Sequence, residues 1–401
     1  MNMVIRSLLT TVLLGLFYAV LSVSLFGQNT LEDCTTIYQA LLDNRTSTDV
    51  KKLRLALSSA NDYMKKCGDR EGQGDEIKTF VTKEIPKIEE RIKAAEIKMV
   101  EDRYASAVKT RNYDEMLATA RELLKMDRPY ALDLMLDVAR VGYDNASAKP
   151  AVNKYNDDAI ASAKQALKSM GEGKGSGNID TTTGAATYGY YVRYKTVKCP
   201  DGQANAAGFM NYIVGYITYV SLKQSKDALP YLYKASETGC ATKGRADIYS
   251  MIGDWYVDEA VKIDTTRIEK VKLAGGKDTD ETLALLAMQK GYIERASDSY
   301  SRAFKSAKAS ETASQGYRDA LLQKSRELYG FRLDGDVSKF ESYIEKAGTT
   351  PFVDPATPIT PIKEEVAQTT PPKAMTNPST TSKPKAKVAT KTKAVKAPSR
   401  K

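Results

Sequence analysis

Three aspartates recur on one face of a predicted helix over residues 246–263. Asp247, Asp254 and Asp258 occupy positions i, i+7 and i+11, apart from the apolar stripe of the same helix. That stripe consists of Ile248, Tyr249, Ile252, Tyr256 and Ile263. A face rich in carboxylates selects a cationic partner, and the chain's own basic C-terminal segment is one candidate. The alternative is an ordinary solvated face without a binding role.

The complete absence of histidine limits the chemistry that the chain can perform. Neither a Ser-His-Asp triad nor a Cys-His pair can form, and no histidine is available to bind a metal. The stretch Gly171–Gly177 lacks the four-residue gap that precedes Gly-Lys in a Walker loop, and is typical of a flexible linker. Paired carboxylates can act without histidine, but no pair stands out among the 50 acidic residues. We therefore expect a protein that is not an enzyme and needs no cofactor or metal.

The first 27 residues are apolar enough to direct export. Arg6 precedes Ser7–Gly27, an uncharged run rich in Leu, Val and Phe, and polar residues follow it. This pattern predicts a secretory signal that is cleaved after Ser24 or Gly27. Since the run is about twenty residues long, the alternative is that it remains as a membrane anchor. Both alternatives place the rest of the chain outside the cytoplasm, in the periplasm or cell envelope.

Four cysteines in an exported chain predict two disulfides. Cys34 and Cys67 flank one predicted helical hairpin over residues 31–66, and Cys199 and Cys240 flank another further along the chain. We expect these two local pairs. Counting along the first hairpin separates its cysteines by about 13 Å along the helix axes, so a bridge requires one end to fold back. The alternative is a zinc site with four cysteines, but the chain has no Cys-x-x-Cys sequence.

Small and large side chains follow a fixed order between residues 212 and 303. The clearest segment is Tyr249-Ser-Met-Ile252-Gly253-Asp-Trp-Tyr256, and Ala228-x3-Leu232-x2-Ala235 and Ala296-x3-Tyr300-x2-Ala303 flank it. Small residues let two antiparallel helices approach closely, while large residues fill the space between neighbouring pairs. This order predicts an all-α chain built from helical hairpins, and an unrelated helical bundle is the alternative.

The first of these segments has the W-x2-L-G-x2-Y spacing of the tetratricopeptide repeat, and the chain resembles that family over roughly residues 96–348. The resemblance implies an α-solenoid of about five stacked antiparallel hairpins, whose first helices line a concave groove. It also implies that this groove takes a peptide or a partner segment. In the register set by Tyr249, the groove-facing residues are Asp247, Ser250, Asp254 and Asp258.

Composition and periodicity divide the chain into six segments. They are the signal or anchor at 1–27, an N-terminal hairpin and capping helix at 28–95, repeat-like hairpins at 96–170, a Gly- and Tyr-rich linker at 171–202, further repeat-like hairpins at 203–348, and a disordered tail at 349–401. Within the linker, Tyr188–Tyr194 alternates as a strand does, and we expect it to pack against the helices.

The tail is basic and rich in proline. Beyond Thr350 the chain has nine of its fourteen prolines, and ten basic residues against three acidic ones, so this +7 leaves +3 of the total +10 elsewhere. Such a segment buries too little apolar area to become ordered. Its lysines can tether the protein to an anionic envelope polymer or a membrane surface; the alternative is a tail that only increases solubility. The lysines concerned are Lys383, Lys385, Lys387, Lys391, Lys393 and Lys396.

These observations predict a non-enzymatic, extracytoplasmic interaction scaffold that binds a protein or peptide partner in its concave groove. The alternative is a structural envelope protein whose helices act as a spacer and whose basic tail does the binding. Removing residues 351–401 separates the two, because surface association is lost only in the second case. Nucleic acid matches the charge of the tail but not the export signal, so no nucleic-acid partner is expected.

Overall fold

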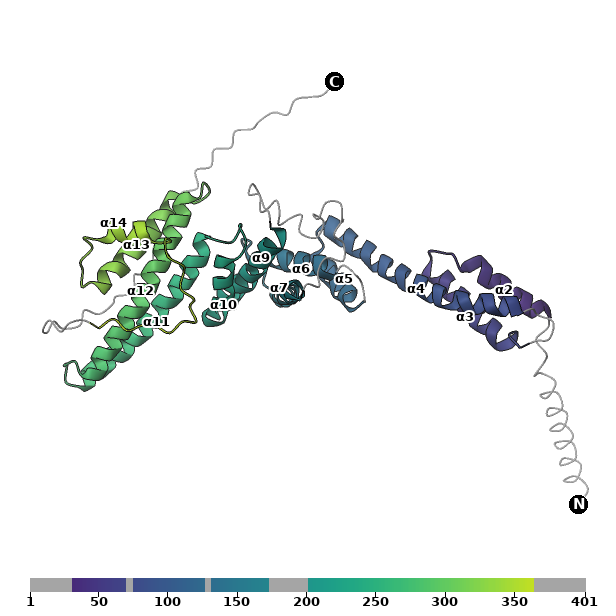
Figure 1. Ribbon diagram of the computed structural model, residues 1–401, viewed down its shortest axis with the longest axis horizontal. Helices are drawn as coiled ribbons and strands as arrows, with labels where there is room; N and C mark the ends of the chain where they lie inside the picture. The colour runs from purple at the N-terminus through teal and green to yellow at the C-terminus, as the bar shows by residue number, and fades with distance from the viewer. Residues whose placement is uncertain (1–30, 70–74, 127–130, 173–200, 364–401) are drawn as a thin grey trace, which may run out of the picture. The chain divides into compact units, whose positions relative to one another are not determined.

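The computed structural model describes residues 31–69, 75–126, 131–172 and 201–363. Every regular element in these ranges is helical: twelve α-helices and one π-helical turn, with no β-strand (Figure 1). The prediction of an all-α fold is therefore confirmed. None of the described helices is both long and apolar enough to cross a membrane. The predicted signal or anchor at 1–27 lies outside the described residues.

The chain forms two units, Met1–Leu134 and Met135–Lys401, and the division falls inside α6 (Ala131–Ala146). The helices that precede α6 are α2 (Leu31–Asn44), α3 (Val50–Lys66), α4 (Asp75–Thr110) and α5 (Tyr113–Lys125). The elements that follow it are α7 (Asn156–Gly171), α9 (Gly202–Tyr216), the π turn η1 (Ile217–Ser221), α10 (Ser225–Glu237), α11 (Ala246–Leu273), α12 (Asp280–Ala309), α13 (Gln315–Arg332) and α14 (Phe340–Lys346). Each helical segment predicted between residues 112 and 348 has a counterpart among them.

A three-helix core organises the first unit. The Asp49 side chain accepts hydrogen bonds from the amides of Lys51 and Lys52, which satisfies the free N–H groups at the start of α3. Helices α2, α3 and the first half of α4 then bury one shared apolar cluster. Its members are Cys34, Leu41, Leu53, Ala56, Ala60, Tyr63, Cys67, Val81, Ile88 and Ile92.

The core of the second unit is rich in aromatic residues and alanine. Its largest cluster draws side chains from α9 to α13 and from one residue beyond α14. The large buried members are Tyr212, Leu229, Leu232, Ile248, Tyr249, Ile252, Trp255, Tyr256, Ile293, Tyr300, Leu321, Leu328 and Phe352. The stripe predicted for α11 is therefore buried as expected, except that Ile263 is only half-buried.

Glycines lie where paired helices approach most closely. A Cβ atom on Gly142 of α6 would lie 2.4 Å from the Cβ of Ala159 on α7. On α11, a Cβ on Gly253 would lie 3.1 Å from the ring of Tyr300 on α12. Gly253 belongs to the Ile252-Gly253 motif of the sequence, and at both positions the absence of a side chain sets the spacing between the helices of a pair.

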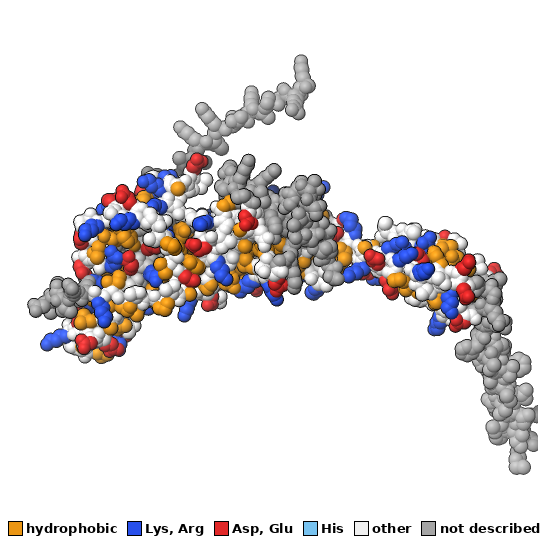
Figure 2. Space-filling model, in the orientation of Figure 1, with side chains coloured by type: hydrophobic (Ala, Val, Ile, Leu, Met, Phe, Trp, Pro, Cys, Tyr) orange, Lys and Arg blue, Asp and Glu red, His pale blue; other side chains and the backbone are white. Residues whose placement is uncertain are grey.

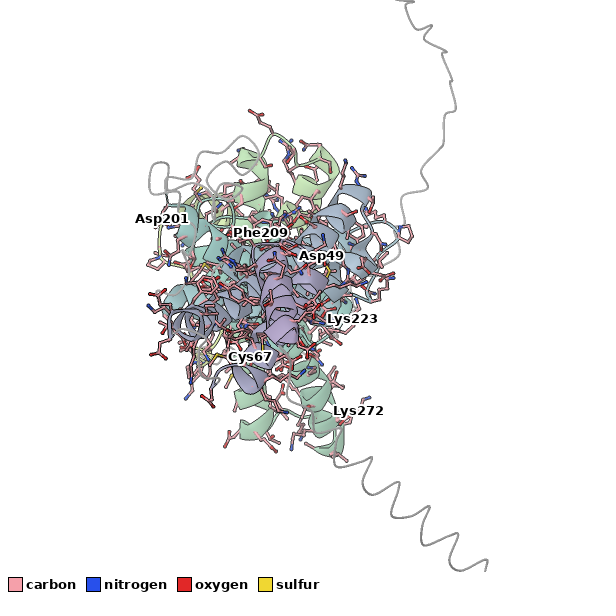
Figure 3. The ribbon with its side chains drawn as sticks, turned by 90° about the vertical axis from the view of Figure 1, so that its right-hand side faces the viewer. Asp49, Cys67, Asp201, Phe209, Lys223 and Lys272 are labelled. Carbon is pink, nitrogen blue, oxygen red and sulfur yellow. A yellow bond between two sulfur atoms is a disulfide. The ribbon has the colours of Figure 1, made fainter. Side chains whose placement is uncertain are left out.

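The residues between Gly253 and Ala296 lengthen two paired helices. The helix expected at 246–263 continues to Leu273, giving α11 28 residues, and its partner α12 has 30. The last turn of α11, with Lys272, lies near the free end of this pair (Figure 3). There Arg267 donates a hydrogen bond of 2.9 Å to Asp278, just before α12 begins.

The predicted disordered tail begins too early at residue 349. Residues 349–363 have no regular structure but pack against the helices, and Phe352 is only 5% exposed. The prediction averaged composition over fifty residues, whereas one aromatic side chain is enough to anchor a short segment. The rest of the tail, 364–401, and the Tyr188–Tyr194 stretch lie outside the described residues.

Candidate functional site

The four residues predicted to face a groove lie along the first four turns of α11, a helix that packs mainly against α10 and α12. Its first turn also contacts Tyr212 of α9, and its third turn contacts Lys324 of α13. Asp247 and Ser250 are half-buried near the start of the helix, and the Ser250 hydroxyl donates to the backbone carbonyl of Asp247 at 3.0 Å. Asp254 is half-buried, while Asp258 is exposed.

Asp247 is neutralised by a basic residue of the chain itself. Arg245 donates two hydrogen bonds to its carboxylate, at 2.7 and 3.0 Å, and the Tyr212 hydroxyl of α9 donates a third at 2.6 Å. The Arg245 guanidinium also lies 4.2 Å from the centre of the Tyr212 ring. Burial alone would raise the pKa of Asp247, but the hydrogen bonds and charge of Arg245 outweigh it, so the pKa lies below its usual value.

Asp254 forms a second group of the same composition. The Lys324 ammonium of α13 donates to its carboxylate at 3.1 Å, and the Tyr300 hydroxyl of α12 donates to the same oxygen. Lys324 lies 5.0 Å from the centre of the Tyr300 ring. Burial raises the pKa of Tyr300, and the negative charge of Asp254 raises it further, so this tyrosine stays protonated and remains a donor.

Asp258 differs from the other two aspartates. Within the described part of the chain, its carboxylate takes part in no ion pair. Burial of the carboxyl raises the pKa of Asp258, and Asp254 one turn away adds to this, whereas Lys262 and Lys324 oppose it. Tyr219 of η1 lies near these charges: burial raises its pKa, and Asp254 and Asp258 both contribute. Asp258 is therefore an exposed carboxylate that forms no ion pair with the described residues.

Tyrosines from three other helices complete this surface. The ring centres of Tyr143 on α6 and Tyr216 on α9 lie 5.3 Å apart, and Tyr212 lies 5.5 Å from Tyr143. On the α13 side, Tyr317 is 37% exposed, and its hydroxyl interacts with Ser250. We call this surface the tyrosine–aspartate face and define it by Tyr216, Tyr219, Asp247, Ser250, Asp254, Asp258 and Tyr317.

Sequence reasoning placed the carboxylates but not these tyrosines. Tyr212 belongs to the core, since it is only 1% exposed. Tyr216 and Tyr219 are half-buried instead. The π turn that begins at Ile217 changes the helical register after Tyr216, and π turns often occur at functional sites. In the sequence, Gly215 follows Tyr212 after three positions, whereas Gly253 follows Tyr249 after four, and this shift indicates the change of register.

The predicted disulfide of the first unit is present between Cys34 and Cys67, with a Cα–Cα distance of 6.0 Å. The axial separation of about 13 Å that was expected from counting residues outward from the turn is too large, because the two Cα atoms lie only 6.0 Å apart. In the structure, residues 45–49 separate α2 from α3, and Cys67 closes the C-terminus of α3 (Figure 3). Cys240 follows α10 and is disulfide-bonded, whereas its predicted partner Cys199 lies outside the described residues, so the pairing itself stays a prediction.

Neither the tail lysines nor a metal-binding group forms a site among the residues that the structure describes. The tail lysines, Lys383 to Lys396, lie outside the described residues. No group of three or more Cys, Asp or Glu side chains in the described ranges could hold a metal ion. On the face that Figure 2 displays, acidic and basic side chains are interspersed over the described helices, in keeping with the small net charge outside the tail.

Comparison with known proteins adds no family to this description. The chain matches no family model, no curated protein and no solved structure.

Proposed function

We propose that this chain is a non-enzymatic, extracytoplasmic interaction scaffold whose tyrosine–aspartate face binds a Lys- or Arg-containing segment of a partner protein. The observation that carries the proposal is a series of three aspartates along one face of α11. Two of them already hold a cation of the chain, Arg245 at Asp247 and Lys324 at Asp254. The third, Asp258, is exposed and holds none among the described residues.

The chemistry of the two filled groups supports a cationic ligand at the third. In each, a carboxylate accepts a charge-assisted hydrogen bond while a tyrosine ring lies beside the same cation, at 4.2 Å for Arg245 and 5.0 Å for Lys324. Asp258 lies one turn beyond Asp254 and faces solvent, and its charge contributes to the raised pKa of Tyr219. A basic side chain of a partner would therefore meet a carboxylate there that holds no cation of the described chain.

Two further features support the wider proposal. The resemblance to tetratricopeptide repeats assigns these residues to the groove side of stacked hairpins. The Cys34–Cys67 disulfide fits an oxidising compartment outside the cytoplasm, in agreement with the export signal expected at 1–27.

The proposal is tested by binding of a fluorescent Arg- and Lys-containing peptide, with a Gln-substituted peptide of the same length as the neutral probe. For Asp258→Asn we expect binding to the basic peptide about fivefold weaker at low ionic strength, equivalent to ~1 kcal/mol. The matched control is Glu345→Gln, which removes an exposed carboxylate from α14 and should leave affinity unchanged. Equal affinity of wild type and Asp258→Asn, or equal binding of the neutral peptide, would contradict the proposal.

A further inference from the structure

Residues 349–363, which we call the strap, follow a path across the helices on a different side of α11. The strap leaves α14 at Gly348 and runs over α10, α11 and α12, visible in Figure 1 as the coil at the yellow end of the colour bar. It contacts Arg302 first, then Gly291 and finally Ala287. The order of these contacts shows that the strap runs antiparallel to α12.

Phe352 anchors the strap in an aromatic pocket. Its ring packs edge-on against Tyr249 of α11, with centres 5.0 Å apart, and lies 6.1 Å from Tyr233 of α10. The Arg302 guanidinium of α12 lies 5.2 Å from the centre of the same ring. Three helices thus enclose one side chain.

Polar side chains of α10 and α12 form hydrogen bonds with the strap backbone beside Phe352. Arg302 donates to the Pro351 carbonyl at 3.4 Å and to the Thr350 hydroxyl at 3.3 Å, and Tyr233 donates to the Phe352 carbonyl at 3.5 Å. At the far end, the Ile362 amide donates to the backbone carbonyl of Ala287 at 2.9 Å. These contacts recognise an extended peptide, because they reach main-chain groups that a helix would use internally.

Gly291 leaves room for the strap. A Cβ atom at this position would lie 2.5 Å from the Thr360 carbonyl oxygen and 2.6 Å from a methyl group of Ile359. Any side chain on Gly291 would therefore displace the second half of the strap. The surface of α12 is shaped for close approach by a backbone.

Few strap residues are buried. Only Phe352 and Pro355 are buried, while most of the others are exposed. A segment held by so few anchors opens more readily than the helices beneath it, since local stability follows buried apolar contacts.

From these observations we propose that the surface of α10, α11 and α12 beneath the strap is a peptide-binding groove for an extended Pro-Phe segment. The chain's own residues 350–362 occupy this groove in the structure as an intramolecular ligand. The same segment supplied in trans binds there when the internal anchor is removed. This groove is separate from the tyrosine–aspartate face, and the proposal does not depend on the function assigned to that face.

The test uses the full chain with Phe352→Ala and a labelled synthetic peptide of residues 349–363. We expect saturable binding of the wild-type peptide and at least tenfold weaker binding of a peptide that carries Phe352→Ala. The wild-type chain should bind the peptide at least tenfold more weakly than the variant, because its tethered strap competes at a high effective concentration. Adding Gly291→Leu to the Phe352→Ala chain should abolish binding. Helical content and Trp255 emission report whether each variant keeps its fold.

The proposal is overturned if a folded Phe352→Ala chain does not bind the peptide, or if Gly291→Leu leaves binding intact. Hydrogen exchange on the wild-type chain provides a second measurement that needs no variant. The Ile362 amide should exchange faster than the amides of α12 near Ala296, because the strap opens by itself. Equal exchange rates would show that the strap leaves only on global unfolding, which also contradicts the proposal.

Discussion

Two surfaces of helix α11 differ in how far the chain itself covers them. On one, Tyr249 meets Phe352 of the strap, and the chain covers the surface with its own peptide. On the other, Asp247 and Asp254 hold cations of the chain, whereas Asp258 stays exposed to solvent. A helical scaffold can therefore cover one recognition surface with a segment of its own chain and leave part of another surface exposed to a partner.

Both surfaces depend on the core that lies between them, so a change there should have the largest effect. Ile252 is fully buried, and Ile252→Ala should lower the free energy of unfolding by ~2–5 kcal/mol because of the lost apolar contacts and the cavity left behind. Urea denaturation followed by circular dichroism measures this loss. Leu273→Ala on the same helix is the control: Leu273 is 88% exposed, and its truncation should change stability by less than about 0.5 kcal/mol. Similar losses for both variants would contradict the assignment of the core.

The second-largest effect should come from a substitution that changes the surface under the strap but not the tyrosine–aspartate face. Phe352→Ala removes a buried aromatic anchor, and should lower the free energy of unfolding by ~1.5–3 kcal/mol. Binding of the basic peptide at Asp258 should not change, since the two surfaces lie on different sides of α11. Val353→Ala is the matched control, because Val353 is 40% exposed and adjacent in the chain. Loss of basic-peptide binding in a folded Phe352→Ala chain would show that the surfaces are not independent.

Within the tyrosine–aspartate face, Asp247 should stabilise the fold. Its pKa lies below the usual value, so its stabilisation is present above the pKa of an unfolded aspartate and is lost as pH falls through the lowered folded pKa. Asp247→Asn should cost ~1 kcal/mol at neutral pH, after allowance for partial exposure of the carboxylate. The difference from wild type should vanish in acid. A cost that is independent of pH would contradict the ion pair with Arg245.

Substitution of Asp258 should change the free energy of unfolding least, and the pH dependence of this change should be opposite to that of Asp247. The pKa of Asp258 is raised, so its contribution to stability is present below the unfolded pKa and falls as pH rises through the raised folded value. Asp258→Asn should therefore leave stability at neutral pH unchanged or increase it by roughly a few tenths of a kcal/mol, since the group is exposed. Thermal unfolding at pH 4 and pH 7 measures this. A clear loss at pH 7 would mean that Asp258 is paired within the fold.

The sequence was sufficient to predict the helices of both units, because apolar spacing and small residues such as Gly253 and Ala296 report packing directly. It also placed the three aspartates of α11 on one face. It could not show that Arg245 and Lys324 neutralise two of them, since Lys324 lies 70 residues from Asp254 and meets it only in the folded chain.

The strap was missed for a different reason. Prolines, threonines and lysines dominate the composition of 349–401, so the average over this segment predicts disorder. One aromatic residue, Phe352, changes that average very little but holds the strap to the helices. The pocket for this anchor comes from Tyr233, Tyr249 and Arg302 on three helices. No local pattern in the sequence connects these positions with the strap.

The proposed function is tested most directly by the pKa of Asp258, measured from its carboxyl carbon signal by NMR with and without the basic peptide. A cation bound at this carboxylate favours the charged form, so saturating peptide should lower the raised pKa towards or below the usual value for aspartate. The pKa of Asp336, which hydrogen bonds from Ser338 hold below its usual value, serves as the internal control and should not move. A pKa of Asp258 that stays the same while the peptide is bound would contradict the account.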